Sequence, residues 1–216
     1  LQHYQEAFVI RMRLALPVAD TENAIGVAHL ARGNHLRPTD PAAAQQEFER
    51  AANLFLRAMD SAEAEHDRRA TSLAVANLAA ARGSLGDLGE AEMLYRRHIR
   101  NMRELGDRSN EALGLINLGE ALRRRGRLEE ARATLTEALS LAQTLGALPR
   151  QRSAHRELAA TCEAARDFEL ALQHFQRFHD CERRLWQESL ESRTALAGIE
   201  LELDRAHQQA ADYRKR

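Results

Sequence analysis

The segment LINLGEALRRRGRLEEARATLTEALSLA, residues 115–142, contains two amphipathic helical patterns on either side of a single glycine. Apolar side chains recur at intervals of three and four residues, so we expect one helix over about residues 109–125 and another over about residues 128–145. Gly126 stands between them, where the end of a helix favours a residue that adopts a left-handed backbone. The segment therefore predicts an antiparallel pair of helices.

Small residues at two positions indicate where these helices approach each other. Gly119 lies on the first helix and Ala131 on the second, and two helix backbones come close only where neither carries a bulky side chain. The larger residues expected around this crossing are Leu118, Leu122, Leu135 and Leu139. One such pair cannot bury its apolar face alone, so we expect neighbouring pairs to stack into a solenoid.

The same pattern recurs every forty residues, without a gap, from Phe48 onward. The positions that coincide are Phe48, Leu88, Leu128 and Phe168; Ala51, Ala91, Ala131 and Ala171; Phe55, Tyr95, Leu135 and Phe175; and Leu78, Leu118 and Leu158. A fixed period of this length is typical of helical repeat proteins. We therefore predict an all-α superhelical solenoid without β-strands, with repeats over about residues 20–67, 68–107, 108–147 and 148–187.

The first repeat departs from this period. Its Leu30-Ala31 pair arrives eight residues earlier than the period requires, and we assign the excess to a loop over residues 33–41. Asp40-Pro41 is predicted to end this loop as a helix N-cap followed by proline at the first helical position. Residues 1–17 are predicted to be the last helix of a preceding, truncated repeat.

Over about residues 20–187 the sequence resembles the tetratricopeptide repeat family. The residues that carry the resemblance in the third copy are Leu118-Gly119, Leu122, Gly126, Ala131, Leu135 and Ala138. The sequence departs from the family pattern in three ways. The terminal proline is absent, the repeat has forty residues where the family has about 34, and the aromatic residue expected near the start of the first helix is replaced by Val75, Leu115 and His155. The resemblance implies a solenoid whose first helices line a concave groove that binds a peptide or protein.

The charge balance argues against two classes of partner. The chain has 31 basic and 32 acidic residues and a net charge of −1, with the two signs interspersed, so we expect neither nucleic acid nor an anionic membrane as a partner. The sequence contains no run of eighteen apolar residues that could span a membrane. The two cysteines, Cys162 and Cys181, form no disulfide framework and fit a reducing cytoplasm.

Asn77 and Asn117 occupy the same position in two consecutive first helices, and Glu157 takes this position in the fourth copy. In peptide-binding members of the resembled family such asparagines form a ladder, since each amide can donate to and accept from one peptide unit of a bound chain. The alternative is that each amide bonds within or between helices, because buried polar groups need partners in any fold. The sequence leaves both interpretations open.

Three arginines, Arg123, Arg124 and Arg156, are predicted to lie near the rim of the same face. A guanidinium group binds a carboxylate through two parallel hydrogen bonds, so these residues are candidates for anchoring acidic side chains of a ligand. The alternative is a solvated face with weak surface ion pairs, which are common in a chain so rich in arginine.

The sequence shows no arrangement for catalysis or for a metal. A zinc site needs four converging ligands at short spacing. The histidines and cysteines of the second half lack that spacing; they are His155, Cys162, His174, His179 and Cys181. Neither a Ser-His-Asp arrangement nor a glycine-rich phosphate loop can be identified. We therefore expect a chain that is not an enzyme and that uses no metal or cofactor.

The last part of the chain is predicted to be one long helix. From Phe168 the helical pattern meets no glycine or proline until Gly198, and the linker predicted over residues 188–216 carries a heptad seam. The seam residues are Leu196, Ile199, Leu203, Ala206, Ala210 and Tyr213. The seam is shorter than three heptads, so we expect a weak homodimer through a short coiled coil.

A second resemblance concerns this junction. The stretch ALQHFQRFH at residues 171–179, followed by Leu185-Trp186 and the charged heptads, is similar to the connection between tetratricopeptide repeats and a helical linker in bacterial signalling proteins. The domain that follows there is most often a GGDEF diguanylate cyclase and sometimes a histidine kinase. The resemblance implies a regulatory segment that couples a bound peptide or protein to an output domain through a dimeric helix. The alternative is a self-contained peptide receptor or scaffold without an output domain.

Overall fold

The computed structural model describes residues 3, 6 and 18–215, with side chains up to residue 191 and at residue 194. The region from residue 18 onward forms eight helices: α2 (Ala19–Leu36), α3 (Pro41–Ala64), α4 (Arg68–Leu85), α5 (Leu88–Leu105), α6 (Arg108–Arg124), α7 (Leu128–Thr144), α8 (Leu148–Ala164) and α9 (Phe168–Lys215). This described part of the chain has no strand, and the predicted all-α fold is confirmed. The helix predicted over residues 1–17 falls almost entirely outside the described residues.

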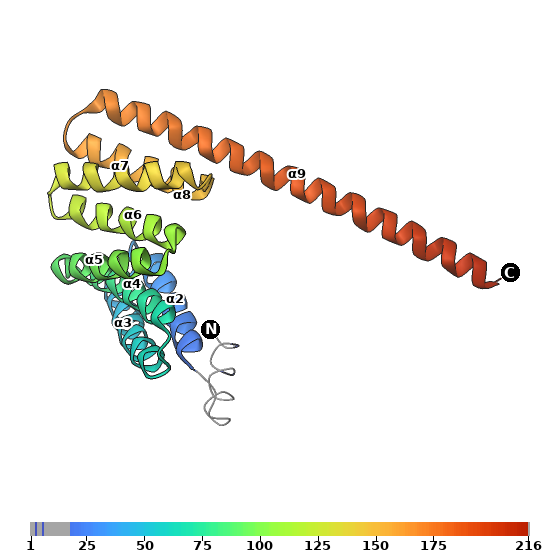
Figure 1. Ribbon diagram of the computed structural model, residues 1–216, viewed down its shortest axis with the longest axis horizontal. Helices are drawn as coiled ribbons and strands as arrows, with labels where there is room; N and C mark the ends of the chain where they lie inside the picture. The colour runs from blue at the N-terminus through green and yellow to red at the C-terminus, as the bar shows by residue number, and fades with distance from the viewer. Residues whose placement is uncertain (1–2, 4–5, 7–17, 216) are drawn as a thin grey trace.

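The helices stack in chain order (Figure 1). Each helix packs against the next one in the chain, and the even-numbered helices α2, α4, α6 and α8 also contact one another in turn. The result is a row of antiparallel pairs, with α9 continuing alone past the end of the row as part of a single helix of 48 residues. Over the described residues, every helix is too short or too polar to span a membrane.

The connections between helices turn on residues with a left-handed backbone. Four of these residues are glycines, with φ of +99° at Gly86, +69° at Gly106, +79° at Gly126 and +62° at Gly146. The turn predicted at Gly126 is therefore confirmed. His66 and Arg166 adopt the same conformation, with φ of +57° and +62°, at positions that carry glycine one repeat away. The left-handed backbone conformation costs about 1 kcal/mol for a residue that has a Cβ atom.

The close approach predicted within the third pair is confirmed. A Cβ atom added to Gly119 on α6 would lie 2.4 Å from Cγ of Leu135 on α7, so only glycine leaves room for that leucine. Leu135, Leu122 and Ala131 are fully buried around this crossing. The third pair thus has a continuous core that α5 and α8 close on its two sides.

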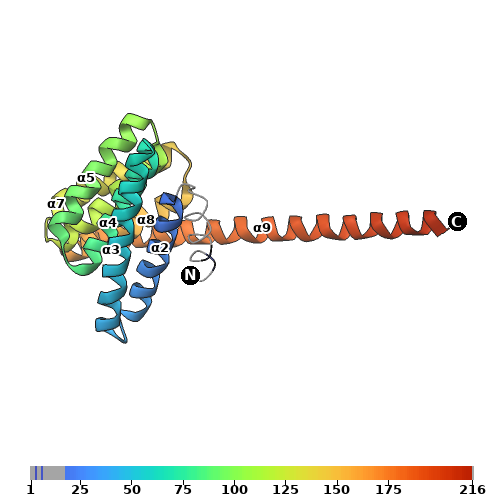
Figure 2. The same cartoon turned by 90° about the horizontal axis from the view of Figure 1, so that it is seen from below.

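The loop predicted over residues 33–41 is wrong. Helix α2 continues to Leu36 and α3 begins at Pro41, so most of the excess residues form additional helical turns (Figure 2). The true close approaches are at Gly26 and Gly33, where an added Cβ would lie 2.6 Å from the Phe55 ring and 2.4 Å from the Phe48 ring, and not at Ala31, which is exposed. The predicted N-cap is confirmed, since Oδ1 of Asp40 accepts a hydrogen bond of 3.0 Å from the backbone of Ala43.

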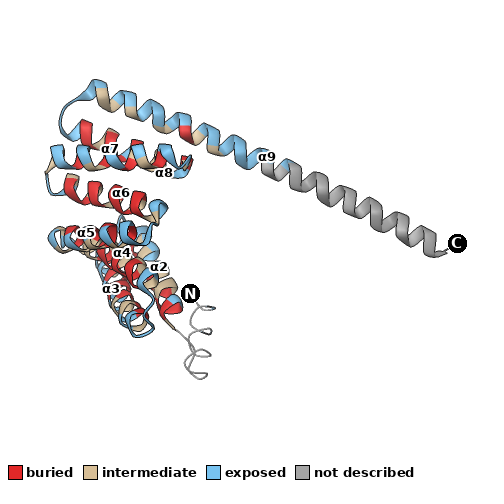
Figure 3. Ribbon diagram, viewed as in Figure 1, coloured by how far each residue is buried: buried red, intermediate tan, exposed pale blue. Residues whose placement is uncertain are grey.

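The matched positions of the last repeat lie in a different environment. Phe55 and Leu135 are fully buried, whereas Phe175, their counterpart on α9, is 51% exposed. Phe168 is exposed as well, although its counterpart Phe48 is buried. The reason is that a following helix covers α3 and α7, while only α8 contacts α9 among the described residues. The row of buried residues therefore ends at α9, where Cys181 is the one buried side chain among those described (Figure 3).

Candidate functional site

A pocket of about 210 Å³ opens where the first helices of three pairs meet. Helix α2 contributes Asn34 and Arg37, α4 contributes Ser84, and α6 contributes Asn117, Glu120 and Arg124, with Leu88 and Tyr95 of α5 also lining it. Because α4 contacts both α2 and α6, this pocket lies on the face that the even-numbered helices share. This is the face for which the sequence predicted a groove.

Two arginines fix the polar wall of the pocket. Arg37 donates from Nη2 to the carbonyl of Ser84 at 3.1 Å, and Arg124 donates from Nη2 to the carbonyl of Gly83 at 2.8 Å. Both carbonyls lie in the last turn of α4, where helix geometry leaves carbonyl groups without partners inside the helix. The positive charges also suit the negative end of the α4 dipole. The pocket therefore carries two guanidinium groups whose positions are set by the backbone.

Tyr95 lies beneath this wall and is nearly buried. Burial raises the pKa of its phenol, and the carboxylate of Glu120 raises it further, against an opposing effect of Arg124. Glu120 in turn lies 3.9 Å from Nη1 of Arg124. The phenol therefore stays neutral over the physiological pH range, and the charged groups of the pocket are the two arginines and Glu120.

The two asparagines of the predicted ladder differ in their surroundings. Nδ2 of Asn77 donates to Oδ1 of Asn23 at 2.8 Å, a bond that joins α4 to α2. Asn117 lines the pocket, and no hydrogen bond joins its side chain to the described part of the protein. Asn23 was not found from the sequence, because the additional turns of the first pair take it out of the forty-residue register.

The other predicted arginines are engaged with Glu157. Arg123 on α6 donates from Nη2 to Oε2 of Glu157 at 3.2 Å, and Arg156 donates from Nε to Oε1 at 3.0 Å. Glu157 is buried, so the two bonds neutralise a carboxylate that would otherwise be costly, and the bond from Arg123 links α6 to α8. Arg124 is the one of the three candidates that lines the pocket. Asn34, Arg37 and Glu120 line it too and were missed by the sequence analysis.

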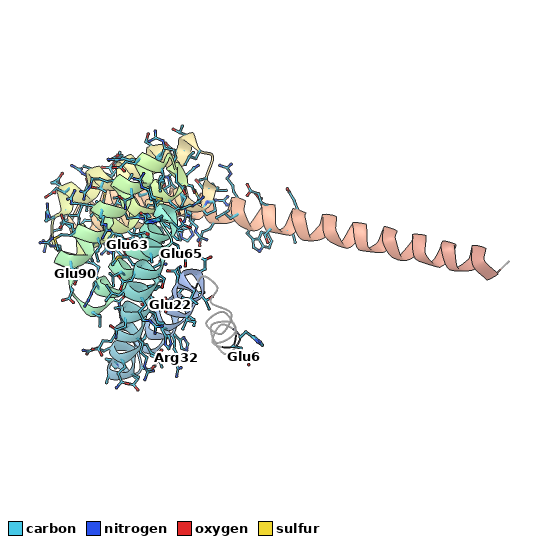
Figure 4. All side chains as sticks on the ribbon, turned by 60° about the horizontal axis from the view of Figure 1, so that its bottom comes forward. Glu6, Glu22, Arg32, Glu63, Glu65 and Glu90 are labelled. Atoms are coloured by element: carbon cyan, nitrogen blue, oxygen red, sulfur yellow. The ribbon has the colours of Figure 1, made fainter. Side chains whose placement is uncertain are left out.

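Buried carboxylates bind arginines elsewhere in the stack. Glu22 on α2 (Figure 4) pairs with Arg57 at 2.6 Å, and Glu92 on α5 accepts from Arg96, Arg125 and Arg127. Burial would raise the pKa of Glu92, but hydrogen bonds from Arg96 and Arg127 outweigh it and hold the pKa below its ordinary value. The bonds from Arg125 and Arg127 to Glu92 connect successive repeats, whereas the contact between Glu22 and Arg57 lies within the first pair.

Two histidines of the last pair are in contact, and both cysteines are buried. Nδ1 of His155 on α8 lies 3.1 Å from Nδ1 of His174 on α9. Burial lowers the pKa of His155 to about 4, and the positive charges of His174 and Arg177 contribute. Both cysteines are buried, and burial raises the pKa of their thiols. In the described region, no three His, Cys, Asp or Glu side chains converge as a metal site would require.

The structure does not test the predicted dimer seam. The side chains of Leu196, Ile199, Leu203, Ala206, Ala210 and Tyr213 lie outside the described residues. The backbone that carries them is helical and belongs to α9.

Comparisons with known proteins agree with this geometry. The model of the family Tetratricopeptide repeat matches residues 109–181. Two crystal structures of nearly identical TPR-like repeats from a Podosopora anserina putative kinesin light chain have a similar fold. One, a single-residue variant, is 16% identical with a TM-score of 0.55 and covers 87% of this chain and 96% of that chain. The other is 16% identical with a TM-score of 0.53 and covers 86% and 96%.

A third structure, BtubC (BKLC) from P. vanneervenii, is 15% identical with a TM-score of 0.42 and covers 77% of this chain and 92% of that chain. None of the curated proteins matches the sequence. At these identities the likeness concerns the fold, which is a tetratricopeptide-like helical solenoid over most of the chain.

Proposed function

Because the chain folds as a tetratricopeptide-like solenoid, we propose that it is a protein-interaction module that binds an extended peptide segment of a partner across α2, α4 and α6. The observation that carries this proposal is the amide of Asn117, which lines the pocket without a bond to the described protein. An amide of this kind can donate to and accept from one peptide unit. A repeat fold of stacked helices supplies such a surface without supplying catalytic groups.

The chemistry of the pocket indicates what the peptide carries. Arg37 and Arg124 present guanidinium groups that favour a carboxylate, either an acidic side chain or a chain terminus. The pocket holds about 210 Å³, which is less than the roughly 300 Å³ at which sites for small organic ligands begin. A peptide that lies across the helices and places one acidic group in the pocket fits this size.

The remaining candidates have smaller expected roles. Asn77, Arg123 and Arg156 each bond to another residue of the chain, so a ligand must compete with Asn23 or Glu157 to reach them. A hydrogen bond exchanged for another contributes little net free energy, whereas a group without a partner contributes fully. We therefore assign them to the margin of the binding surface.

The experiment is a selection of random peptides on the immobilised chain, followed by calorimetric titration of the best sequence. Asn117→Ala is expected to weaken binding by about 1 to 3 kcal/mol, because the bound peptide unit loses its partner. Asn77→Ala is expected to have a smaller effect, and Asn53→Ala, at an exposed position on α3, is the matched control. Equal affinity of the parent and the Asn117 variant for every selected peptide contradicts the proposal.

A finer proposal concerns what the module does with its partner. The 48-residue helix α9 leads from the last pair away from the stack, as a connection to an output domain does. On this basis the chain is the regulatory segment of a cytoplasmic signalling protein, with a diguanylate cyclase of the GGDEF type as the output domain. The competing candidate is a self-contained receptor or scaffold. The reading frame after the codon for Arg216 in the parent gene tests this: an output domain supports the first, and an immediate stop codon supports the second.

A further inference from the structure

Helix α9 carries a row of exposed apolar side chains, which we call the apolar stripe. It consists of Phe168, Leu172, Phe175, Trp186 and Leu190, which are 66%, 57%, 51%, 67% and 50% exposed. With about 100° of rotation per residue, all five lie within an arc of about 60° on one side of the helix. A surface this apolar on a monomer marks an interaction site.

The stripe borders a groove at the position where a further helix would pack if the repeat continued. Phe168, Leu172 and Phe175 line a cavity of about 480 Å³ together with Ala159 and Ala160 of α8. In the preceding pair, the residue equivalent to Phe175 is Leu135, which is fully buried because α8 packs against α7. The open groove is thus the place of the next first helix, and it fits an amphipathic helix that runs antiparallel to α9.

We propose that a second copy of this chain supplies that helix, so that two α9 helices pair antiparallel about a twofold axis between residues 180 and 181. This surface is separate from the peptide pocket and goes beyond the proposed function. Within the stack, the second helix of each pair runs antiparallel to the first helix of the next pair, and the proposed contact has the same direction. A contact of this type uses the same surface on both copies, as closed dimers do.

The spacing of the stripe is self-complementary about this axis. Phe175 of one copy lies opposite Trp186 of the other, and Leu172 lies opposite Leu190. In these two pairs, each residue and its counterpart stand at equal distances from the axis, to within one position, and Phe168 lies beyond the paired segment. The two aromatic or aliphatic clusters of one helix thus cover those of its partner, and the shared groove receives the segment around Trp186 and Leu190.

The polar residues in the middle of the stripe favour the same arrangement. His179 and Glu182 lie between the two apolar clusters, and Nδ1 of His179 is 3.2 Å from Oε2 of Glu182 within one copy. The ring of His179 is also held against Phe175, with 4.5 Å between ring centroids. In the antiparallel pair each histidine faces a glutamate of the other copy. In a parallel pair, glutamate would face glutamate, which is unfavourable.

The area available agrees with a weak but specific dimer. Five large side chains that are about half exposed present roughly 500 Å² in each copy, or about 1,000 Å² in the pair, near the lower limit for specific interfaces. A parallel coiled coil through the seam predicted at residues 196–213 places equal residues side by side, so the two arrangements exclude each other in one dimer. One set of measurements therefore separates them.

The first measurement is sedimentation equilibrium of the full chain at several concentrations. We expect a reversible dimer for the parent and at least a tenfold weaker association for Trp186→Glu. Met93→Glu on α5 is the matched control, since Met93 is also 67% exposed but lies far from the stripe, and it is expected to dimerise like the parent. Circular dichroism reports the fold of each variant, which exposed substitutions should preserve.

The second measurement tests the register. Phe175→Lys alone and Trp186→Glu alone are expected to be monomeric, and an equal mixture of the two is expected to form a heterodimer in which lysine faces glutamate. A parallel pair never brings residues 175 and 186 together and gives no such rescue. The double variant Ile199→Asp, Leu203→Asp is expected to remain dimeric. A parent that is monomeric throughout, a dimer unaffected by Trp186→Glu, a mixture that stays monomeric, or loss of the dimer in the double variant each overturns the proposal.

Discussion

Helices α7 and α9 occupy the same position in consecutive repeats and carry matching residues, yet only one of them is buried. Leu135 of α7 is enclosed between Gly119 of α6 and the following helix, while Phe175 of α9 remains half exposed. Their local sequences are equally apolar at this position. The comparison shows that burial in a solenoid depends on whether another helix follows, which no local pattern records.

The largest expected effect is the difference in stability between variants of these two matched residues. Leu135→Ala should lower the free energy of unfolding by about 3 kcal/mol, because it removes a fully buried side chain and leaves a cavity. Phe175→Ala should lower it by less than about 1 kcal/mol, since half of that ring already contacts water. Urea unfolding at a low protein concentration, where the chain is monomeric, measures both. Equal losses would show that the exposed face of α9 is covered.

The second prediction compares the pH dependence of stability that arises from His155 of the last pair with the apolar residue at the same position of the third pair. His155 stands where Leu115 stands one repeat earlier. Its pKa is about 4 in the folded chain and 6.5 otherwise, so the unfolded chain binds more protons in between. Stability should therefore be complete above pH 6.5 and fall as the pH approaches 4, by on the order of 2 kcal/mol from this group.

The matched variant is His155→Leu, which copies the third repeat. Thermal melts between pH 4 and pH 7 should show a smaller pH dependence in this variant than in the parent. His98, whose pKa is also lowered by burial, titrates in both proteins, so the difference between them reports the contact of His155 with His174. Parallel profiles for the two proteins would contradict the assignment.

The third prediction concerns the small residue that faces Leu135 or Phe175 from the preceding helix. Gly119→Ala should destabilise the fold by about 1 to 2 kcal/mol, because the new Cβ overlaps Leu135. The same position on α8 is already alanine, Ala159, beside the less confined Phe175. Ala159→Gly should therefore cost only about 1 kcal/mol, through helix propensity alone. Chemical unfolding of both variants checks the difference in mechanism, since a second substitution Leu135→Val should partly rescue Gly119→Ala only.

The smallest expected effect compares the turns. Arg166→Gly should stabilise the chain by about 0.5 to 1 kcal/mol, because Arg166 has a positive φ in the turn before α9. Gly126→Ala, at the equivalent turn before α7, should destabilise it by a similar amount. Melting temperatures decide this, and a lower melting temperature for the Arg166 variant would indicate that the arginine side chain makes a compensating contact.

The fold was predictable from the sequence because its determinants are local and periodic. Gly119, Leu135 and Gly126 each act within one helix pair, and the forty-residue period repeats their relation along the chain. The first pair was misread because its additional residues preserve helical spacing and lengthen α3, which has 24 residues where α5 has 18. No composition change marks that difference, and the contacts of Gly26 with Phe55 and of Gly33 with Phe48 show where the pair closes.

The pocket was predictable only in part. Asn117 was found because it repeats Asn77, and Arg124 because it lies at the exposed end of the same helix, while Arg37 and Asn23 belong to the lengthened pair and lie outside its register. The role of Glu157 was also hidden, since its pairing with Arg123 crosses from α6 to α8. Contacts between repeats depend on how the pairs are stacked, and that information is absent from the pattern within each pair.

Helix α9 also sets a length scale for whatever this chain joins. Its 48 residues rise about 72 Å at 1.5 Å per residue, nearly all of it in one straight rod. In a twofold pair centred between residues 180 and 181, the two ends at Lys215 point in opposite directions and stand about 100 Å apart. Domains attached at these ends would be too far apart to contact each other, so the paired helices would act as a rigid spacer between them.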